Sequence, residues 1–124
     1  MDSMENNSIL LSIKKLVGSG EDNDDFDGDI ITHINTTLSI LQQLGVGPSD
    51  GFSIEDATAT WTDYLGDDHK YINMVKSYMA ANVRQLFDPP VQSAIAGALE
   101  RDINRYEWRI NVAAENHQRE VSAE

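Results

Sequence analysis

The residues best suited to bind a metal ion gather in one acidic segment, residues 21–29, which reads EDNDDFDGD. An EF-hand calcium loop has oxygen ligands at its first, third and fifth positions, glycine at the sixth and a bidentate glutamate at the twelfth. With Gly28 at the sixth position, the first three ligands are Asn23, Asp25 and Asp27. The twelfth position is then Ile34, so the motif fails. We interpret the segment as a solvated loop whose acids favour the start of the next helix, with adventitious divalent-ion binding as the weaker alternative.

Groups that would serve an enzyme are scattered along the chain. The three histidines stand far apart in sequence, at His33, His69 and His117. The chain has no nucleophile elbow, no P-loop and no dinucleotide-binding glycine pattern. The paired acids Asp67 and Asp68 are most simply a helix cap. We therefore expect no catalytic residue, no metal and no cofactor.

The formal charge of −12 argues against nonspecific binding to nucleic acid, because neutralising phosphates requires Lys and Arg. The charge is unevenly spread. Residues 1–29 hold eight acids against Lys14 and Lys15, a balance of −6. Residues 30–66 contribute −4, and residues 67–124 only −2. The C-terminal half is therefore the part most free to make contacts with other molecules.

Length and composition set the remaining bounds. A chain of 124 residues is one domain and buries roughly two-thirds of the surface that its unfolded form exposes. It has no cysteine, so disulfides and thiolate metal sites are excluded. The longest apolar run is Ile9-Leu10-Leu11, and no basic-then-apolar leader opens the sequence. We expect neither a cleaved signal nor a membrane span.

The spacing of apolar residues predicts an all-α fold, a compact bundle of four main helices with a long loop between the second and the third. The predicted helices span residues 8–17, 29–44, 68–87 and 91–114. Ser8 is a suitable N-cap for the first helix and Gly18 its stop. A short helical turn around Trp61 is expected to seal the core, with Phe26 as a further anchor.

The ends and the long loop are expected to be less regular. Residues 1–7 are predicted to form a flexible N-terminus, residues 8–114 the helical domain, and residues 115–124 a flexible polar tail. Residues 45–59 are rich in Gly, Pro, Ser and Asp, which predicts a surface loop with at most a small hairpin. The helix over 68–87 is apolar over more than half its circumference, which predicts a central position in the bundle.

The predicted helix over 91–114 has two distinct faces. At 100° per residue, an apolar stripe lies within about 40° of Leu99; its members are Ile95, Leu99, Ile103, Tyr106, Ile110 and Ala113. The opposite side carries Arg101, Arg105, Trp108 and Val112. Trp and Arg are enriched at interface hot spots, so we interpret this flank as a contact to another subunit. The alternatives are that Trp108 packs under the 45–60 loop of its own chain, or that the basic stripe is merely solvated.

Four ordered stretches resemble a known family. They are FDGDIITHINTTLSILQQLGVGP, FSIEDATATWTDYLGDD, VKSYMAANVRQLFDPP and ALERDINRYEWRINV. Together they resemble the head–tail connector (adaptor) proteins of tailed bacteriophages, most closely those of phages infecting low-GC Gram-positive bacteria. The likeness covers roughly residues 8–115. The string VRQLFDPP followed by a helix with EWR is its most specific part.

The resemblance implies a virion protein that assembles in the host cytoplasm into a ring below the dodecameric portal protein. Such a ring extends the DNA channel and offers a platform for a stopper or tail-completion protein, while DNA passes without specific binding. The resemblance also implies that the C-terminal segment reaches the portal. The chain departs from the family in its acidic loop at 21–29 and its polar tail after Ala114.

Two rival functions come from other classes. An acidic phage regulator that mimics DNA would suit the charge, but its acids should follow helix faces rather than gather in loops. A metal-dependent enzyme lacks a ligand set. Competition with DNA for a host nuclease or repressor would distinguish the mimic from a structural connector.

Overall fold

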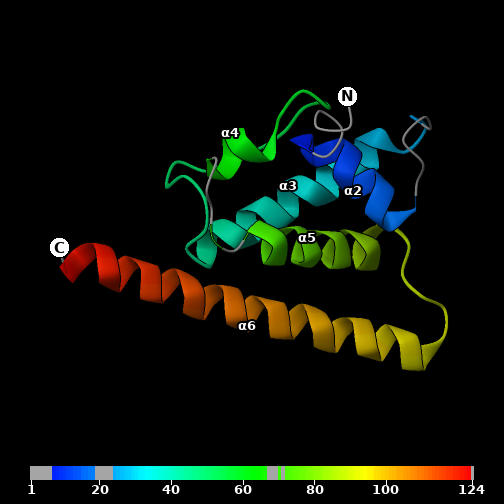
Figure 1. The fold of residues 1–124 in the computed structure, drawn as a ribbon. Helices are drawn as coiled ribbons and strands as arrows, with labels where there is room; N and C mark the ends of the chain where they lie inside the picture. The colour runs from blue at the N-terminus through cyan, green and yellow to red at the C-terminus, as the bar shows by residue number, and fades with distance from the viewer. Residues whose placement is uncertain (1–6, 19–23, 67–69, 71, 124) are drawn as a thin grey trace.

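A computed structural model gives the fold of the chain and describes residues 7–18, 24–66, 70 and 72–123, with side chains described up to residue 116 (Figure 1). The described residues form helices and no strand; one isolated antiparallel bridge joins Ser8 and Thr60. The helices are α2 (Ile9–Val17), α3 (Asp27–Gln43), α4 (Trp61–Leu65), α5 (Ile72–Phe87) and α6 (Ser93–Ala123). The predicted all-α class, its four main helices and the short turn at Trp61 are confirmed.

Helix α5 lies at the centre of the fold, as its apolar circumference predicts. It packs against α2 and α3 on one side and against α6 on the other (Figure 1). Val75, Tyr78, Met79 and Val83 of α5 are fully buried, whereas Asn73 and other polar residues lie in an exposed strip. A helix with neighbours on two sides must be apolar on both, which explains its wide apolar arc.

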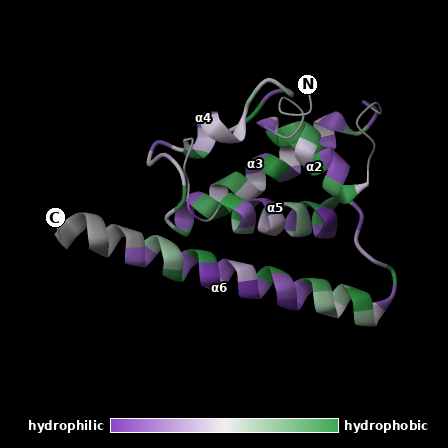
Figure 2. Cartoon of the chain, viewed as in Figure 1, coloured by the Kyte–Doolittle hydropathy of each residue, from purple (hydrophilic) through white to green (hydrophobic). Residues whose placement is uncertain are grey.

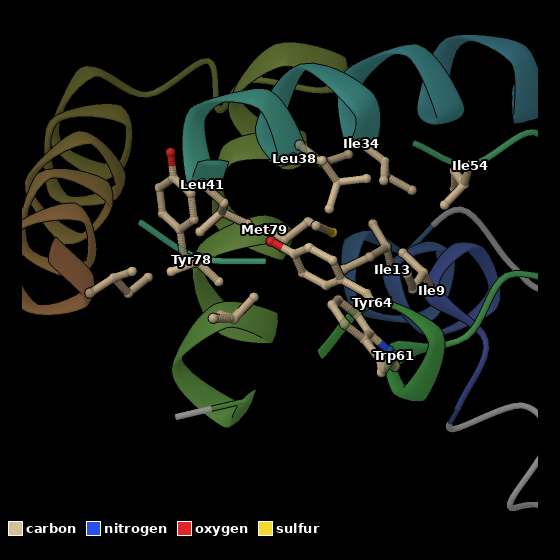
Figure 3. Close-up of a cluster of buried hydrophobic side chains, with 14 of the residues drawn as sticks. Ile9, Ile13, Ile34, Leu38, Leu41, Ile54, Trp61, Tyr64, Tyr78 and Met79 are labelled. Carbon is tan, nitrogen blue, oxygen red and sulfur yellow. The ribbon is translucent and has the colours of Figure 1, made fainter. Parts of the chain in front are cut away.

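The core joins side chains from every helix and from the long loop (Figure 3). Figure 3 shows Trp61 and Tyr64 of α4 beside Ile9 and Ile13 of α2. The loop after α3 adds the buried Val46 and Ile54. Among the α6 side chains that the structure describes, Ile103, Ile110 and Ala114 are buried in this core.

Helix α2 begins and ends as the sequence predicts. The Ser8 Oγ accepts a hydrogen bond from the Leu11 N–H, and Gly18 ends the helix with φ 83° in the left-handed region. The helical spacing of Ile9, Ile13, Leu16 and Val17 predicts that these residues share the inward face. That prediction is partly wrong, because Leu16 is 58% exposed while Leu10 and Lys14 are buried. The buried face of this short helix is turned toward α5 and the start of α3.

The long loop is tied to α2 and α3 rather than folded as a hairpin. The Ser8 Oγ donates to the Ala57 carbonyl at 2.8 Å, and the Trp61 Nε1 donates to the Ser12 Oγ at 2.9 Å. Asn35 of α3 forms hydrogen bonds with both the N–H and the carbonyl of Ile54. These contacts fix the loop and place Trp61 over α2.

Helix α6 departs from the prediction at both ends. It continues through Ala123, so the predicted helix end at Ala114 is wrong. The later residues carry no apolar stripe, but they include no Gly or Pro and several good helix formers, so nothing stops the helix. The last turns project past the other helices (Figure 1). Whether the two ends are flexible stays a prediction, and residues 1–6 lie outside the described part.

At the other end of α6, Ile95 is 47% exposed although the sequence assigns it to the core stripe. The segment around Asp88-Pro89-Pro90 carries the chain outward before α6 begins, so its first turn lies at the edge of the bundle (Figure 1). Among the described residues, no helix has both the length and the apolarity needed to cross a membrane.

Candidate subunit interface

The outer flank of α6, defined as Arg101, Arg105, Trp108 and Val112, faces away from the core. Trp108 is 68% exposed, both arginines are exposed, and Val112 is half-buried. Along the same helix, Ile103 and Ile110 are buried in the opposite direction, and Figure 2 shows hydrophilic and hydrophobic residues alternating along it. The two-sided helix expected from the sequence is therefore present. The alternative that Trp108 packs under the 45–60 loop is wrong.

Two hydrogen bonds hold α6 in this rotation. The Tyr78 hydroxyl of α5 donates to the Glu107 Oε2 at 2.8 Å, and the Asn111 Nδ2 donates to the Leu44 carbonyl at 3.4 Å. Burial of the Tyr78 ring, followed by its bond to the Glu107 carboxylate, raises the pKa of the phenol above its ordinary value. Because Glu107 and Trp108 are adjacent, anchoring Glu107 to α5 directs the indole outward.

The cationic groups of the outer flank are only weakly engaged within the chain. The Arg105 Nη1 lies 3.7 Å from the Asp102 Oδ1, with both side chains more than half exposed. An exposed pair of this kind contributes at most about 1 kcal/mol. The Arg101 guanidinium folds back over Gly97. Both arginines can therefore be redirected toward a partner at little cost.

A second exposed apolar surface, which sequence reasoning missed, lies where α3 begins and α5 ends. It is an open hollow of about 670 Å³, called here the end hollow, lined by Phe26, Asp29, His33, Leu86, Phe87 and Asp88. Phe26 and Leu86 are each 45% exposed. The sequence predicts Phe26 as a core anchor and places Leu86 in the apolar arc of the helix expected over 68–87, and both assignments to the core are wrong. The Phe26 ring instead contacts the edge of Phe87, with centroids 5.5 Å apart.

The acidic segment has a structural role at this end of the molecule. Lys14 of α2 is only 1% exposed, and its Nζ lies 2.9 Å from the Asp27 Oδ1 and 3.6 Å from the Asp24 Oδ1. Burying an ammonium group requires such a partner. The ion pair ties the end of α2 to the start of α3, and Phe26 lies between its two acids in sequence. The acids thus hold Phe26 at the rim of the end hollow.

The groups considered for metal chemistry do not come together in the described part of the chain. No group of three or more His, Asp or Glu residues there is placed to hold a metal ion. His33 is half-buried and lines the end hollow. Asn23, His69 and the side chain of His117 lie outside the described residues.

Fold and surface together define a small helical protein with a large indole and several apolar side chains exposed to solvent. The sequence model of the phage connector protein family matches residues 9–117. The chain therefore belongs to the phage connector protein family, and its assembly with other head–tail proteins at the head–tail region of the virion follows from that membership. No curated protein and no solved structure matches the chain.

Proposed function

We propose that this chain is the structural subunit of an adaptor ring below the portal, where it extends the DNA channel and bridges to a stopper or tail-completion protein. The observation that carries this proposal is the two-sided α6. One face of the helix completes the subunit core, while the outer flank presents a 68% exposed indole between arginines. Trp and Arg are the residue types most enriched among the strongest contacts of protein assemblies.

The charge supports a channel through which DNA slides. A net charge of −12 creates a repulsive potential toward phosphate, and residues 1–66 carry −10 of it, because they hold twelve acids against two lysines. DNA therefore passes such a wall without specific binding. Four of the five arginines lie on α6, where the subunit contact is proposed.

The same charge predicts how the ring forms. A ring of about a dozen chains would carry on the order of a hundred negative charges, and their repulsion opposes closure at low ionic strength. The free protein should therefore be a monomer or a weak oligomer in the host cytoplasm. Apolar and arginine-mediated contacts offset the repulsion once the portal gathers the copies. The projecting end of α6 is the segment proposed to reach the portal.

The test is a mass measurement of the chain alone, the portal protein of the same phage alone, and their mixture. We expect a monomer alone and a complex of several copies on each portal ring in the mixture. Truncation after Asn116 keeps Ile103, Ile110 and Ala114, the buried residues among the α6 side chains that the structure describes, and should weaken portal binding. The matched control Asn73→Ala changes an exposed polar residue of α5 and should bind normally. Wild-type chain that never joins the portal would overturn the proposal.

A further inference from the structure

We propose that the outer flank of α6 in one copy docks into the end hollow of the next copy, so that adjacent subunits associate head to tail. This inference rests on the proposed ring function and identifies the two surfaces that meet. It is drawn from two surfaces of one chain that are chemically complementary and separately exposed.

The complementarity is both apolar and ionic. The outer flank offers an indole with a guanidinium on either side, at Arg101 and Arg105. The end hollow offers three apolar side chains, with the exposed carboxylates of Asp29 and Asp88 beside them. Seating the indole among the apolar groups removes both from water. The same pose lets the arginines reach carboxylates, a pairing whose fork geometry favours specific recognition.

The outer flank and the end hollow of one copy do not contact each other. The end hollow is lined by residues where α3 begins and α5 ends. The outer flank lies on the middle turns of α6, opposite the buried Ile103 and Ile110. Figure 1 shows that the middle turns of α6 lie away from the end of α5. Within a single copy, Trp108, Phe26 and Leu86 all stay exposed. A contact between two different surfaces is heterologous, so each docked copy still presents one free flank or one free hollow. Such contacts repeat and close into a ring when the rotation permits.

The negative charge of the end hollow indicates which kind of partner binds there. Two carboxylates disfavour a phosphate-bearing partner such as DNA and favour an aromatic flanked by cations. The chain has two tryptophans, and the other one, Trp61, is 1% exposed in the core. Trp108 with its arginines is therefore the group of this chain that fits. In a ring, moreover, the molecule next to each subunit is another copy of the same chain.

Cysteine cross-linking tests the contact. The chain contains no cysteine, so two copies can be linked only through the cysteines that are introduced. Leu86→Cys marks the hollow and Arg105→Cys marks the flank. The two variants are mixed on portal and treated with a short bis-maleimide. We expect covalent dimers from the mixture, a ladder of higher species from the double variant, and no product from either variant alone. Pairing Arg105→Cys with the exposed Lys15→Cys is the matched control and should give no product.

Charge reversal tests the ionic part separately. Asp88→Lys and the pair Arg101→Glu with Arg105→Glu should each lower the number of copies bound per portal at least tenfold. Combining all three changes in one chain restores opposite charges across the contact and should recover most of the binding. A combined variant no better than its parents would overturn the inference.

The two proposals fail differently. If wild-type chain fills the portal normally but Leu86→Cys cross-links only to the portal or to a tail protein, this contact is wrong and the ring function stands. If wild-type chain never joins the portal, the ring function fails. In that case the two cysteine variants are mixed without portal, at raised ionic strength and high protein concentration. If no mixed dimer forms under these conditions, the proposed contact between subunits is wrong.

Discussion

The two tryptophans of the chain lie in opposite environments. Trp61 is 1% exposed, donates a hydrogen bond to Ser12 across the core and has the Lys76 ammonium 5.4 Å from its ring centroid. Trp108 is 68% exposed. The same residue type thus closes the fold at one site and faces solvent at the other. Residue type alone does not distinguish these uses, whereas the helical phase of Trp108 relative to the core stripe does.

The largest expected effect is on the free energy of unfolding when each tryptophan is replaced by alanine. Trp61→Ala should lower the free energy of unfolding by about 3–5 kcal/mol, because it empties a packed site and leaves Ser12 without its donor. Trp108→Ala should change it by no more than about 0.5 kcal/mol, as expected at an exposed position. Urea unfolding of both variants measures the difference. Equal losses would contradict the assignment of one tryptophan to the core and the other to the surface.

A second prediction concerns the ion pair beside the end hollow. Lys14→Ala should cost about 2 kcal/mol, because it removes a buried ammonium group and leaves Asp27 without its nearest cation. The effect is smaller than for a fully buried pair, since the Asp27 side chain is 28% exposed. Lys15→Ala is the matched control, with an exposed side chain in the same last turn of α2. Urea midpoints that shift equally for the two variants would show that the pair does not hold this end together.

A smaller effect is expected at the bond that sets the rotation of α6. Tyr78→Phe should cost about 1 kcal/mol at neutral pH through loss of the hydrogen bond to Glu107. The folded-state pKa of Tyr78 is raised, so its contribution is fully present below the unfolded-state value of about 10 and declines as pH rises past it. Unfolding measured between about pH 8 and 11 should show a shallower alkaline decline in Tyr78→Phe than in wild type. Parallel declines would contradict this account of Tyr78.

Much of the fold could be predicted because local physics governs it. Ser8 and Gly18 bound α2 through capping geometry, and the wide apolar arc of α5 indicates its central place. The missed end of α6 has a clear cause. The polar composition after Ala114 predicts a tail, but apolar residues govern packing and not helicity, so a polar segment can continue a helix.

The end hollow could not be predicted from the sequence. Its shape depends on how the start of α3 meets the end of α5, which no local pattern encodes. Leu86 belongs to an apolar arc, and only the tertiary arrangement leaves it half exposed. The burial of Lys14 is equally hidden, because lysine is normally exposed and its partner Asp27 lies on another helix. A lone aromatic within an acidic segment, Phe26, was the available signal.

The most direct test of the central claim is the number of Trp108→Ala copies bound per portal ring, measured by native mass spectrometry beside the wild type. The account predicts at least a tenfold loss of bound copies with an unchanged free energy of unfolding, and partial recovery in Trp108→Phe. Full occupancy by Trp108→Ala would contradict the claim that α6 keeps this flank for a neighbouring subunit.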